Sequence, residues 1–436
     1  MDPKLLRNTN SEILILITVI DATFEIYSDC FRESLMRVSY DETEVVDDPM
    51  EQRIAHFDLD SFYVAVERAE NSKLMDVPVL VGWPGPRGVV ATASYEARIY
   101  GCHSAQPMNQ AMQKCPQAIV ISPDMTKYRE YSDAFHQILL ERTPLVERAG
   151  LDEAYVDLSV LAANGLGEPL SVARELRQTV LDTLKLTVSV CVAGSKPTAK
   201  IGSAYSKPDG CLEIPVGTDA LFLSTLPIRK MPSVGPKFQK ALVKMEITTI
   251  GELANADSKW LEMRFGRQGL LMKKRAQARD KSTVRRSPGQ AKSISKESTF
   301  PEDLLVDTDL FVELLRLSQS VSNELRGNHR AIKTVSIKIR WSNFDLTSRQ
   351  KTIEDGVRSH KQVYEIAKDL LETELKMNRS RGVRLLGVGL SNFIDEQFQL
   401  PLSSELNKKF VRDKSIETTM QEIHGKFGSN SIRRGH

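Results

Sequence analysis

The stretch from Ile54 to Glu67 constrains this chain more than any other, because a strand turns into a helix there at two carboxylates. Apolar residues lead into Asp58 and Asp60, and apolar residues at helical spacing follow from Phe62. Carboxylates at a strand end suit a hard cation such as Mg²⁺, which takes oxygen ligands and leaves room for substrate phosphates. Either acid could instead be the N-cap of the following helix, and this stretch alone does not separate the two interpretations.

A second acidic pair, Asp152 and Glu153, follows Gly150. Apolar and polar residues alternate from there through Leu158, which predicts a half-buried strand. Adjacent side chains on a regular strand point to opposite faces, so the two acids can share a metal only at a bend or a strand end, and Gly150 suits such a bend. A solvated turn is the alternative, but carboxylates among apolar strand formers are costly without partners.

Two acidic strand ends far apart in sequence are what a two-metal phosphoryl-transfer site requires, with the cations held roughly 4 Å apart. Such a site also needs positive groups for a triphosphate. Tyr95 and Arg98 are spaced i, i+3 on one face of a predicted helical turn, and Lys207 precedes a Pro-Asp-Gly turn. A single Arg or Lys is more commonly a solvated surface charge, so only the set as a whole favours a site.

Four motifs follow one another along the chain. They are Phe-Asp-Leu-Asp-Ser-Phe-Tyr from Phe57, Ala-Thr-Ala-Ser-Tyr-Glu-Ala-Arg from Ala91, Leu-Asp-Glu-Ala-Tyr-Val-Asp from Leu151, and Ala-Lys with Ser-Lys-Pro-Asp-Gly between Ala199 and Gly210. In this order they resemble the Y-family translesion DNA polymerases, in particular the bacterial DinB or DNA polymerase IV branch. The resemblance covers roughly Arg53 to the C-terminus, and four ordered motifs are far more specific than one.

The resemblance implies an error-prone, template-directed DNA polymerase that bypasses lesions by adding dNTPs to a primer 3′-hydroxyl. It implies that Asp58 and Asp152 bridge two Mg²⁺ ions. Glu153 would complete the site of the metal that activates the primer hydroxyl, and the Leu59 carbonyl would help to hold the other metal. Tyr63 stands where the family places an aromatic steric gate against a ribose 2′-hydroxyl, although a core aromatic is the commoner fate of such a residue. The implied nucleotide-binding residues are Tyr63, Thr92, Tyr95, Arg98 and Lys207.

At 436 residues the chain is too long for a single core. The resemblance implies an α+β multidomain fold, a right-handed polymerase with palm, small fingers, helical thumb and little finger. The expected domains are an N-terminal extension (1–52), a catalytic palm (53–61 and 127–214), fingers (62–126), a thumb with a helix-hairpin-helix (215–279), a linker (280–290), a little finger (291–394) and a C-terminal tail (395–436). In the palm we expect helices at 128–142, 170–184 and 197–205 and strands at 151–159 and 187–192. In the little finger we expect the order βαββαβ, with strands at 292–300, 332–341, 347–353 and 383–390 and helices at 309–326 and 361–376.

The net charge of +2 conceals a strongly basic segment. From Lys230 to Glu297 there are 16 Lys and Arg against 6 Asp and Glu, which suits a polyanion such as DNA better than a merely soluble helical surface. A turn before a helix start, as at Gly235, can bind a DNA phosphate through backbone N–H groups, although plain helical hairpins share this pattern. Strand alternation places Lys338 and Arg340 on one face of the last unit, opposite an apolar side. The candidate DNA-binding residues are Gly235, Lys237, Lys240, Lys338 and Arg340.

The ends of the chain fit the family pattern less well. Met1 to Gln52 matches no part of it, its apolar run is too short for a bilayer span, and Met36 or Met50 could be the true start. In the tail, Gln399-Leu400-Pro401-Leu402 resembles the short peptide that docks on the sliding clamp, while an ordinary linker is an equal alternative. The five cysteines have no metal-site spacing, so we expect reduced thiols, no zinc and a cytoplasmic monomer that binds primer-template DNA and dNTPs.

The deepest departures from the family pattern lie in the expected palm, where Gly150 replaces a usual Ser and Cys191 stands where Gly is common. Neither removes a predicted ligand, so they put local geometry in question. Two rival functions are a non-catalytic DNA-bound scaffold of the same fold and a nucleotidyl cyclase. The intact acids argue against the scaffold, and the basic segments argue against the cyclase.

Overall fold

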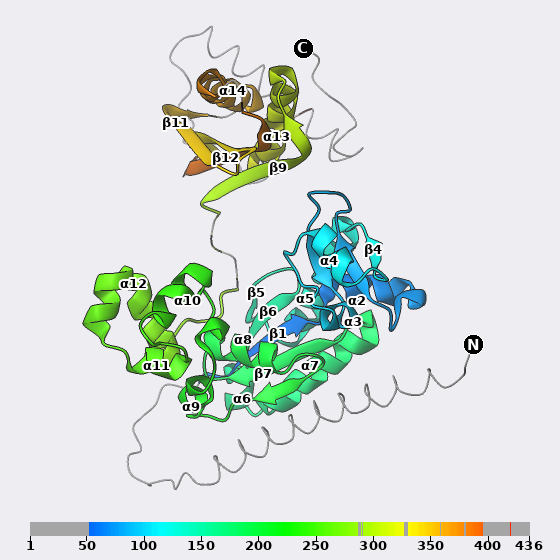
Figure 1. The fold of residues 1–436 in the computed structure, drawn as a ribbon. Coiled ribbons are helices and arrows are strands. Elements are labelled where there is room, and N and C mark those ends of the chain that lie inside the picture. Colours follow the sequence, from blue (N-terminus) through cyan, green and yellow to red (C-terminus); the bar gives the residue numbers. More distant parts are fainter. Residues whose placement is uncertain are drawn as a thin grey trace. The chain divides into compact units, whose positions relative to one another are not determined.

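The computed structural model describes residues 52–286, 289, 291–326, 330–357, 359–378, 381–395 and 419. These residues form three β-sheets and a group of helices (Figure 1). The N-terminal 51 residues and the Gln399–Leu402 peptide lie outside the described part of the chain. No helix among the described residues is long and apolar enough to cross a membrane.

The largest sheet of the first half has five strands in the order β5-β6-β1-β7-β8. They are β1 (Ile54–Leu59), β5 (Val146–Arg148), β6 (Glu153–Asp157), β7 (Val188–Ala193) and β8 (Cys211–Glu213). Every residue of β1 is buried, which its nearly continuous apolar run explains. β1 pairs antiparallel with β6 and β7, and this register sets Asp58 between Glu153 and Ser189. The sheet therefore brings both acidic motifs together.

Helices cover both faces of this sheet. They are α5 (Met125–Arg142), α6 (Ser159–Ala163), α7 (Pro169–Leu184) and α8 (Lys196–Tyr205). Phe57 packs into the core that α5 and α7 cover. His56 points the other way, where its Nδ1 lies 2.7 Å from Oγ of Ser203 on α8. Because side chains alternate along a strand, Asp58 and its partner Glu153 share the α8 face.

A smaller unit surrounds a three-stranded sheet in the order β3-β2-β4. Its elements are α2 (Phe62–Glu70), a 3₁₀ turn η2 (Ser72–Leu74), β2 (Val79–Gly82), β3 (Val90–Ala93), α3 (Tyr95–Ile99), α4 (Met108–Lys114) and β4 (Ile119–Ile121). α3 starts at Ser94, whose side chain accepts a hydrogen bond from the Ala97 N–H. This cap fixes the direction in which Tyr95 and Arg98 leave the backbone.

A group of short helices follows β8. It comprises α9 (Asp219–Ser224), the 3₁₀ turn η3 (Ile228–Lys230), α10 (Pro236–Val243), α11 (Ile250–Asn255) and α12 (Ser258–Ala276). Gly235 is the N-cap of α10, and Pro236 occupies the first position of the helix. Proline is tolerated there because the backbone N–H at this position has no partner within the helix. Thr249 and Glu252 form a capping box at α11. A turn between two helical segments at Gly235 is as the sequence predicted.

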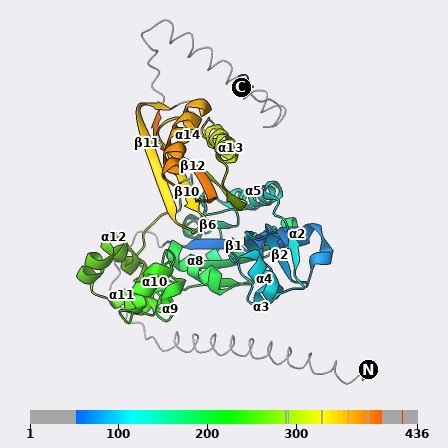
Figure 2. The ribbon, with the colours of Figure 1, turned by 45° about the horizontal axis from the view of Figure 1, so that its top comes forward.

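The C-terminal unit has the predicted order βαββαβ (Figure 2). Its elements are β9 (Ser293–Leu304), α13 (Asp307–Arg326), β10 (Arg330–Trp341), β11 (Leu346–Val357), α14 (His360–Met377) and β12 (Val383–Asp395). The sheet order β11-β10-β12-β9 interleaves two split βαβ units, all antiparallel. On β10, Val335, Ile337 and Ile339 are buried, whereas Lys338 and Arg340 are not. The predicted alternation of faces is confirmed.

Most element boundaries fall within a few residues of those predicted, and the largest differences have local causes. The strand expected from Leu151 begins at Glu153, because the Ala149 and Gly150 N–H groups both donate to the Glu153 carbonyl in a tight turn. That turn is the predicted bend at Gly150. β11 and β12 run beyond their predicted ends because each pairs along most of β10.

Candidate active site

The two acidic motifs meet at the end of β1. Asp58 and Glu153 are directly opposite each other, and the Leu59 N–H donates to the Asp152 carbonyl at 2.9 Å. Asp152 itself lies in the bend before β6, so it escapes the strict alternation of a strand. Asp58 is buried, and the other two carboxylates are half-buried. Three oxygen-donor side chains thus come from two neighbouring strands.

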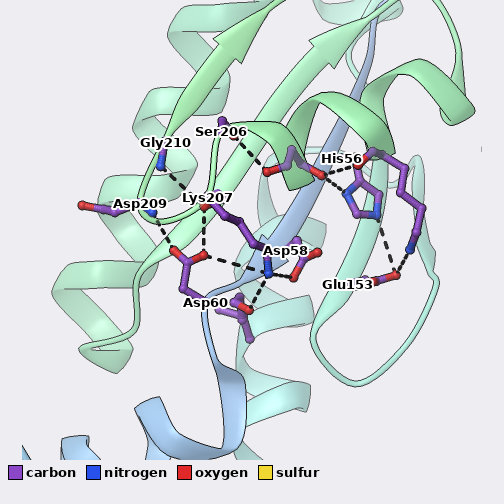
Figure 3. A network of polar contacts seen from close by, with 12 residues as sticks. His56, Asp58, Asp60, Glu153, Ser206, Lys207, Asp209 and Gly210 are labelled. Atoms are coloured by element: carbon purple, nitrogen blue, oxygen red, sulfur yellow. Dashed lines mark hydrogen bonds and ion pairs between the residues drawn. The ribbon is translucent and has the colours of Figure 1, made fainter. Parts of the chain in front are cut away.

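Two lysines form ion pairs with this acidic cluster, and Figure 3 shows one of them, Lys207, beside Asp58. The Lys207 ammonium lies 2.6 Å from Oδ1 of Asp58 and 3.5 Å from the Leu59 carbonyl oxygen. Lys200 of α8 forms an ion pair with Glu153, which also faces His56 across 3.8 Å. The middle of α8 and the turn after this helix therefore supply positive charge to the acidic cluster. The role of Lys200 was not predicted from the sequence.

The acids differ in how their surroundings shift their pKa values. Burial raises the pKa of Asp58, although Lys207 acts in the opposite direction. Burial and the adjacent charge of Glu153 also raise the pKa of Asp152. Contact with His56 and the ion pair with Lys200 lower the pKa of Glu153 to about 2. Glu153 is therefore an anion throughout the physiological range, and the other two carboxyls titrate at higher pH than usual.

The chemistry of these donors fits a hard cation, because all are carboxylate or carbonyl oxygens. The Lys207 ammonium lies between the Asp58 carboxylate and the Leu59 carbonyl oxygen, so these two oxygens already bind a positive group. Within the described residues, however, no three acids, histidines or cysteines converge closely enough to form a ready metal centre. Asp58 and Glu153 would have to turn from their lysines to share one ion.

Asp60 is a residue whose role the sequence did not reveal. It is buried, and it accepts hydrogen bonds from the Tyr95 hydroxyl (3.2 Å), the Ser189 hydroxyl (2.9 Å) and the Asp209 N–H (2.8 Å). Neither Asp58 nor Asp60 caps α2, because Ser61 is the N-cap and no side chain bonds there. Asp60 instead ties α3 to the sheet through Tyr95, and it holds the turn after Lys207 through the Asp209 N–H (Figure 3). The close acidic spacing with Asp58 was the only hint in the sequence.

Tyr95 and Arg98 share one face of α3, as predicted. The Arg98 guanidinium lies over the Tyr95 ring, 4.7 Å from its centroid, and its Nε donates to the Ala93 carbonyl. Burial and the nearby charge of Asp60 raise the pKa of Tyr95, so its hydroxyl remains a donor. The bond to Ala93 uses only Nε of Arg98, so the two terminal nitrogens of the guanidinium can turn toward an anion.

The remaining nucleotide-binding candidates lie on the smaller unit. Tyr63 is half-buried on the first turn of α2, with its ring stacked on that of Tyr128. Thr92 is half-buried on β3, where it pairs with Val81 of β2. Tyr63 also lies close enough to the Asp152 carboxylate for that charge to contribute to its raised pKa, after burial. The aromatic ring thus borders the acidic cluster.

The candidate DNA-binding residues are at the surface. Gly235 and Lys237 are exposed at the start of α10, and Lys240 is exposed in its last turn. On β10, Lys338 forms an ion pair with Glu297 at 2.8 Å, and Arg340 donates to the Phe344 carbonyl. Gly235, Lys237 and Lys240 are therefore more accessible to DNA than Lys338 and Arg340, whose side chains already have protein partners.

Comparison with known proteins agrees with this geometry. The models of the impB/mucB/samB family and of its C-terminal domain match residues 57–204 and 291–402. The chain is 36% identical over 385 residues to the DNA polymerase IV of Dehalococcoides mccartyi, covering 88% of this chain and 97% of that one. It is 34% identical over 384 residues to the DNA polymerase IV of Caulobacter vibrioides, with 88% and 93% covered.

Solved structures extend the likeness to the fold. A chimera of the Y-family DNA polymerases Dbh and Dpo4 superposes with a TM-score of 0.72 at 27% identity, covering 79% of this chain and all of that chain. DinB from Sulfolobus solfataricus gives 0.53 at 28% identity over the same shares. The chain is thus a DNA polymerase of the Y family. Within that family it belongs to the DNA polymerase IV, or DinB, branch of translesion polymerases, which confirms the prediction from the four motifs.

Proposed function

We propose that Asp58, Asp152 and Glu153 are the catalytic carboxylates of this polymerase. The observation that carries the proposal is the pairing of β1 with β6, which sets Asp58 opposite Glu153 on the face where two lysines gather, with Asp152 in the adjoining bend. Two Mg²⁺ ions, when bound, would offset charge on the attacking and leaving oxygens. Asp58 and Asp152 would bridge them, Glu153 would complete the site beside the primer hydroxyl, and the Leu59 carbonyl would support the other.

Lys207, Tyr95 and Arg98 would grip the triphosphate. The Lys207 ammonium now lies on Asp58, so a nucleotide and its cations would free it to contact phosphate oxygens. Tyr95 is positioned by Asp60 and Arg98 is stacked on Tyr95, which holds both side chains in place before the substrate arrives. Tyr63 would act as the steric gate against ribonucleotides, with Thr92 near the incoming base.

Primer-template DNA would be held by the helical group and by the C-terminal sheet. In this proposal the five-stranded sheet is the palm (53–61 and 127–214) and the smaller unit the fingers (62–126). The helical group is then the thumb (215–279), followed by the little finger (291–394). Lys237 is exposed next to the helix start at Gly235, which supports a phosphate contact there, and Lys240 is exposed further along the same short helix. Clamp binding through Gln399–Leu402 stays a prediction, to be tested by deleting that peptide.

Primer extension tests the catalytic assignment. A labelled primer on a DNA template, with Mg²⁺ and dNTPs, should be extended by the intact protein but not by the Asp152→Ala, Glu153→Ala double variant. The matched control is Asp157→Ala, which removes an acid from the same strand four residues after Glu153. DNA binding by fluorescence anisotropy should persist in all three proteins. Extension by the double variant would refute the assignment of these acids.

DNA binding by the helical group is tested separately. Replacing both Lys237 and Lys240 by alanine should weaken DNA binding and lower the slope of log K against log salt by about 0.9 for each phosphate that is no longer neutralised. An unchanged slope would exclude these residues from the DNA interface.

A further inference from the structure

We propose that Tyr128 and Glu67 form a brace that holds the ring of Tyr63 in place and so sets how strongly the enzyme excludes ribonucleotides. This inference rests on the proposed role of Tyr63 as the steric gate. It assigns a specificity role to two residues that make no contact with the nucleotide in the proposed site.

The first observation is an aromatic stack behind Tyr63. The rings of Tyr63 and Tyr128 are almost parallel, 13° apart, with centroids separated by 4.2 Å. Phe62 flanks both rings in tilted contacts, at 5.4 Å from Tyr63 and 6.2 Å from Tyr128. Tyr128 is fully buried, whereas Tyr63 is half-buried. One face of the Tyr63 ring therefore rests on a ring that is enclosed by the core.

The second observation is that a buried carboxylate fixes Tyr128. The Tyr128 hydroxyl donates to Oε1 of Glu67 at 2.7 Å, and Lys127 donates to Oε2 at 3.1 Å. Glu67 is only 8% exposed, so these two bonds compensate for its desolvation. Glu67 lies one turn after Tyr63 on α2, the same helix that carries the gate. Tyr128 of α5 therefore contacts two residues of α2, with its ring stacked on Tyr63 and its hydroxyl bound to Glu67.

The first turn of α5 holds the other side of the brace. Asp124 is the N-cap of α5 and accepts hydrogen bonds from the N–H groups of Thr126 and Lys127. This cap fixes the backbone from which Lys127 and Tyr128 reach Glu67. Two helices that are distant in sequence are locked together directly behind the gate.

A gate must be rigid to discriminate. An rNTP differs from the matching dNTP by the single oxygen atom of its 2′-hydroxyl. A Tyr63 ring that can tilt or slide makes room for this atom at little cost in free energy. Stacking alone leaves sliding in the ring plane nearly free, whereas a hydrogen bond to a buried charge fixes one end of Tyr128. Packing alone would be served equally by phenylalanine at position 128, so the Tyr128 hydroxyl and the buried Glu67 are the features that indicate more than core packing.

The test measures selectivity rather than activity. Single-nucleotide incorporation of a dNTP and of the matching rNTP gives the ratio of the two kcat/KM values. Tyr63→Ala should collapse this ratio, and Tyr128→Leu, which removes the stack, should lower it by at least about tenfold. Both Tyr128→Phe and Glu67→Gln keep the stack. The first removes the hydrogen bond, and the second replaces its charged acceptor by a neutral amide, so each should lower the ratio by about threefold or more while dNTP incorporation persists.

Controls separate the brace from general damage. Tyr131 lies on the same helix three residues on and donates to Glu70 at an exposed site, so Tyr131→Phe and Tyr131→Leu should leave the ratio unchanged. The Tyr128→Phe, Glu67→Gln double variant should lose no more selectivity than Tyr128→Phe alone, because both substitutions act on the same hydrogen bond. All proteins are compared below their melting temperatures.

The outcomes distinguish this inference from the proposed gate. An unchanged ratio in Tyr63→Ala would overturn the gate itself. A collapsed ratio in Tyr63→Ala with wild-type ratios in folded Tyr128→Phe and Glu67→Gln proteins would overturn the brace and leave the gate standing. Tyr128→Phe and Glu67→Gln test the brace even if Tyr128→Leu does not fold.

Discussion

Replacement of Asp60 by asparagine should weaken both the fold and nucleotide binding. Asp60 accepts three hydrogen bonds, from Tyr95, Ser189 and the backbone of Asp209. These partners belong to three segments, of which two carry proposed triphosphate contacts. The Asp60 carboxylate is therefore a single point at which the nucleotide site can be loosened without touching a catalytic acid.

The magnitude follows from the hydrogen bonds. Asparagine keeps one acceptor oxygen, which can serve Tyr95 and Ser189, but its NH₂ group then faces the Asp209 N–H, so one charge-assisted bond is broken. A hydrogen bond to a charged group contributes about 1.5–3 kcal/mol, so the free energy of unfolding should fall by about that much. Asp60→Ala also leaves the buried Ser189 hydroxyl without this acceptor, and should cost about 1–3 kcal/mol more.

Two measurements test this expectation. Urea denaturation gives the loss of stability, and primer extension at varied dNTP concentration should show a KM that rises by about tenfold for Asp60→Asn, since about 1.4 kcal/mol of positioning is removed. Ser189→Ala is the control, because it removes a partner of Asp60 that lies outside the proposed triphosphate contacts. It should reduce stability without raising KM. An Asp60→Asn protein with wild-type stability and KM would refute the reasoning.

Two further predictions concern the interior. A Cβ on Gly202 would lie 2.2 Å from the Cys191 sulfur, so Gly202→Ala should destabilise the protein by about 1–3 kcal/mol in urea denaturation, and adding Cys191→Gly should restore most of the loss. Absence of rescue would show that this contact is not the cause. Burial lowers the pKa of His136 below 6.5, so the unfolded state binds that proton more readily, and stability should fall as pH drops below about 6.5. In His136→Gln, melting temperatures between pH 7.5 and 5 should fall less steeply, and parallel slopes would contradict the assignment.

The sequence predicted much of the fold because local pattern and burial agree. Alternation in β10 predicted which residues face the core, and the apolar run before Asp58 predicted a buried strand. Cys191, a departure from the family pattern, turns out to be accommodated by Gly202, which leaves room for its sulfur. That compensation depends on how α8 crosses β7, and no local pattern contains this information.

The sequence predicted that Asp58, Glu153 and Lys207 lie close together, as they do in the structure, whereas several other contacts around them could not be predicted. Asp58, Asp152 and Glu153 belong to motifs at strand ends, and the order of these motifs along the chain indicates a shared site. Lys200, Asp60 and the Tyr128–Glu67 pair depend on register and helix docking across as many as 149 residues, as between Asp60 and Asp209. Sequence spacing is silent on such contacts, because they arise only when the sheet has formed.

The stretch from Ile54 to Glu67, which most constrains the fold, also explains how the candidate active site is built. Ser61 has left-handed backbone angles (φ 44°, ψ 44°) at the junction of β1 and α2. Before this turn, Asp58 and Asp60 emerge among the acids and the lysine-bearing turn. Directly after it, Tyr63 emerges with its ring stacked on that of Tyr128. One change of backbone direction thus separates the proposed metal- and phosphate-binding groups from the proposed steric gate. A buried carboxylate holds each set, Asp60 for the first and Glu67 for the second. Nucleotide affinity and discrimination against ribonucleotides should therefore respond independently to mutation.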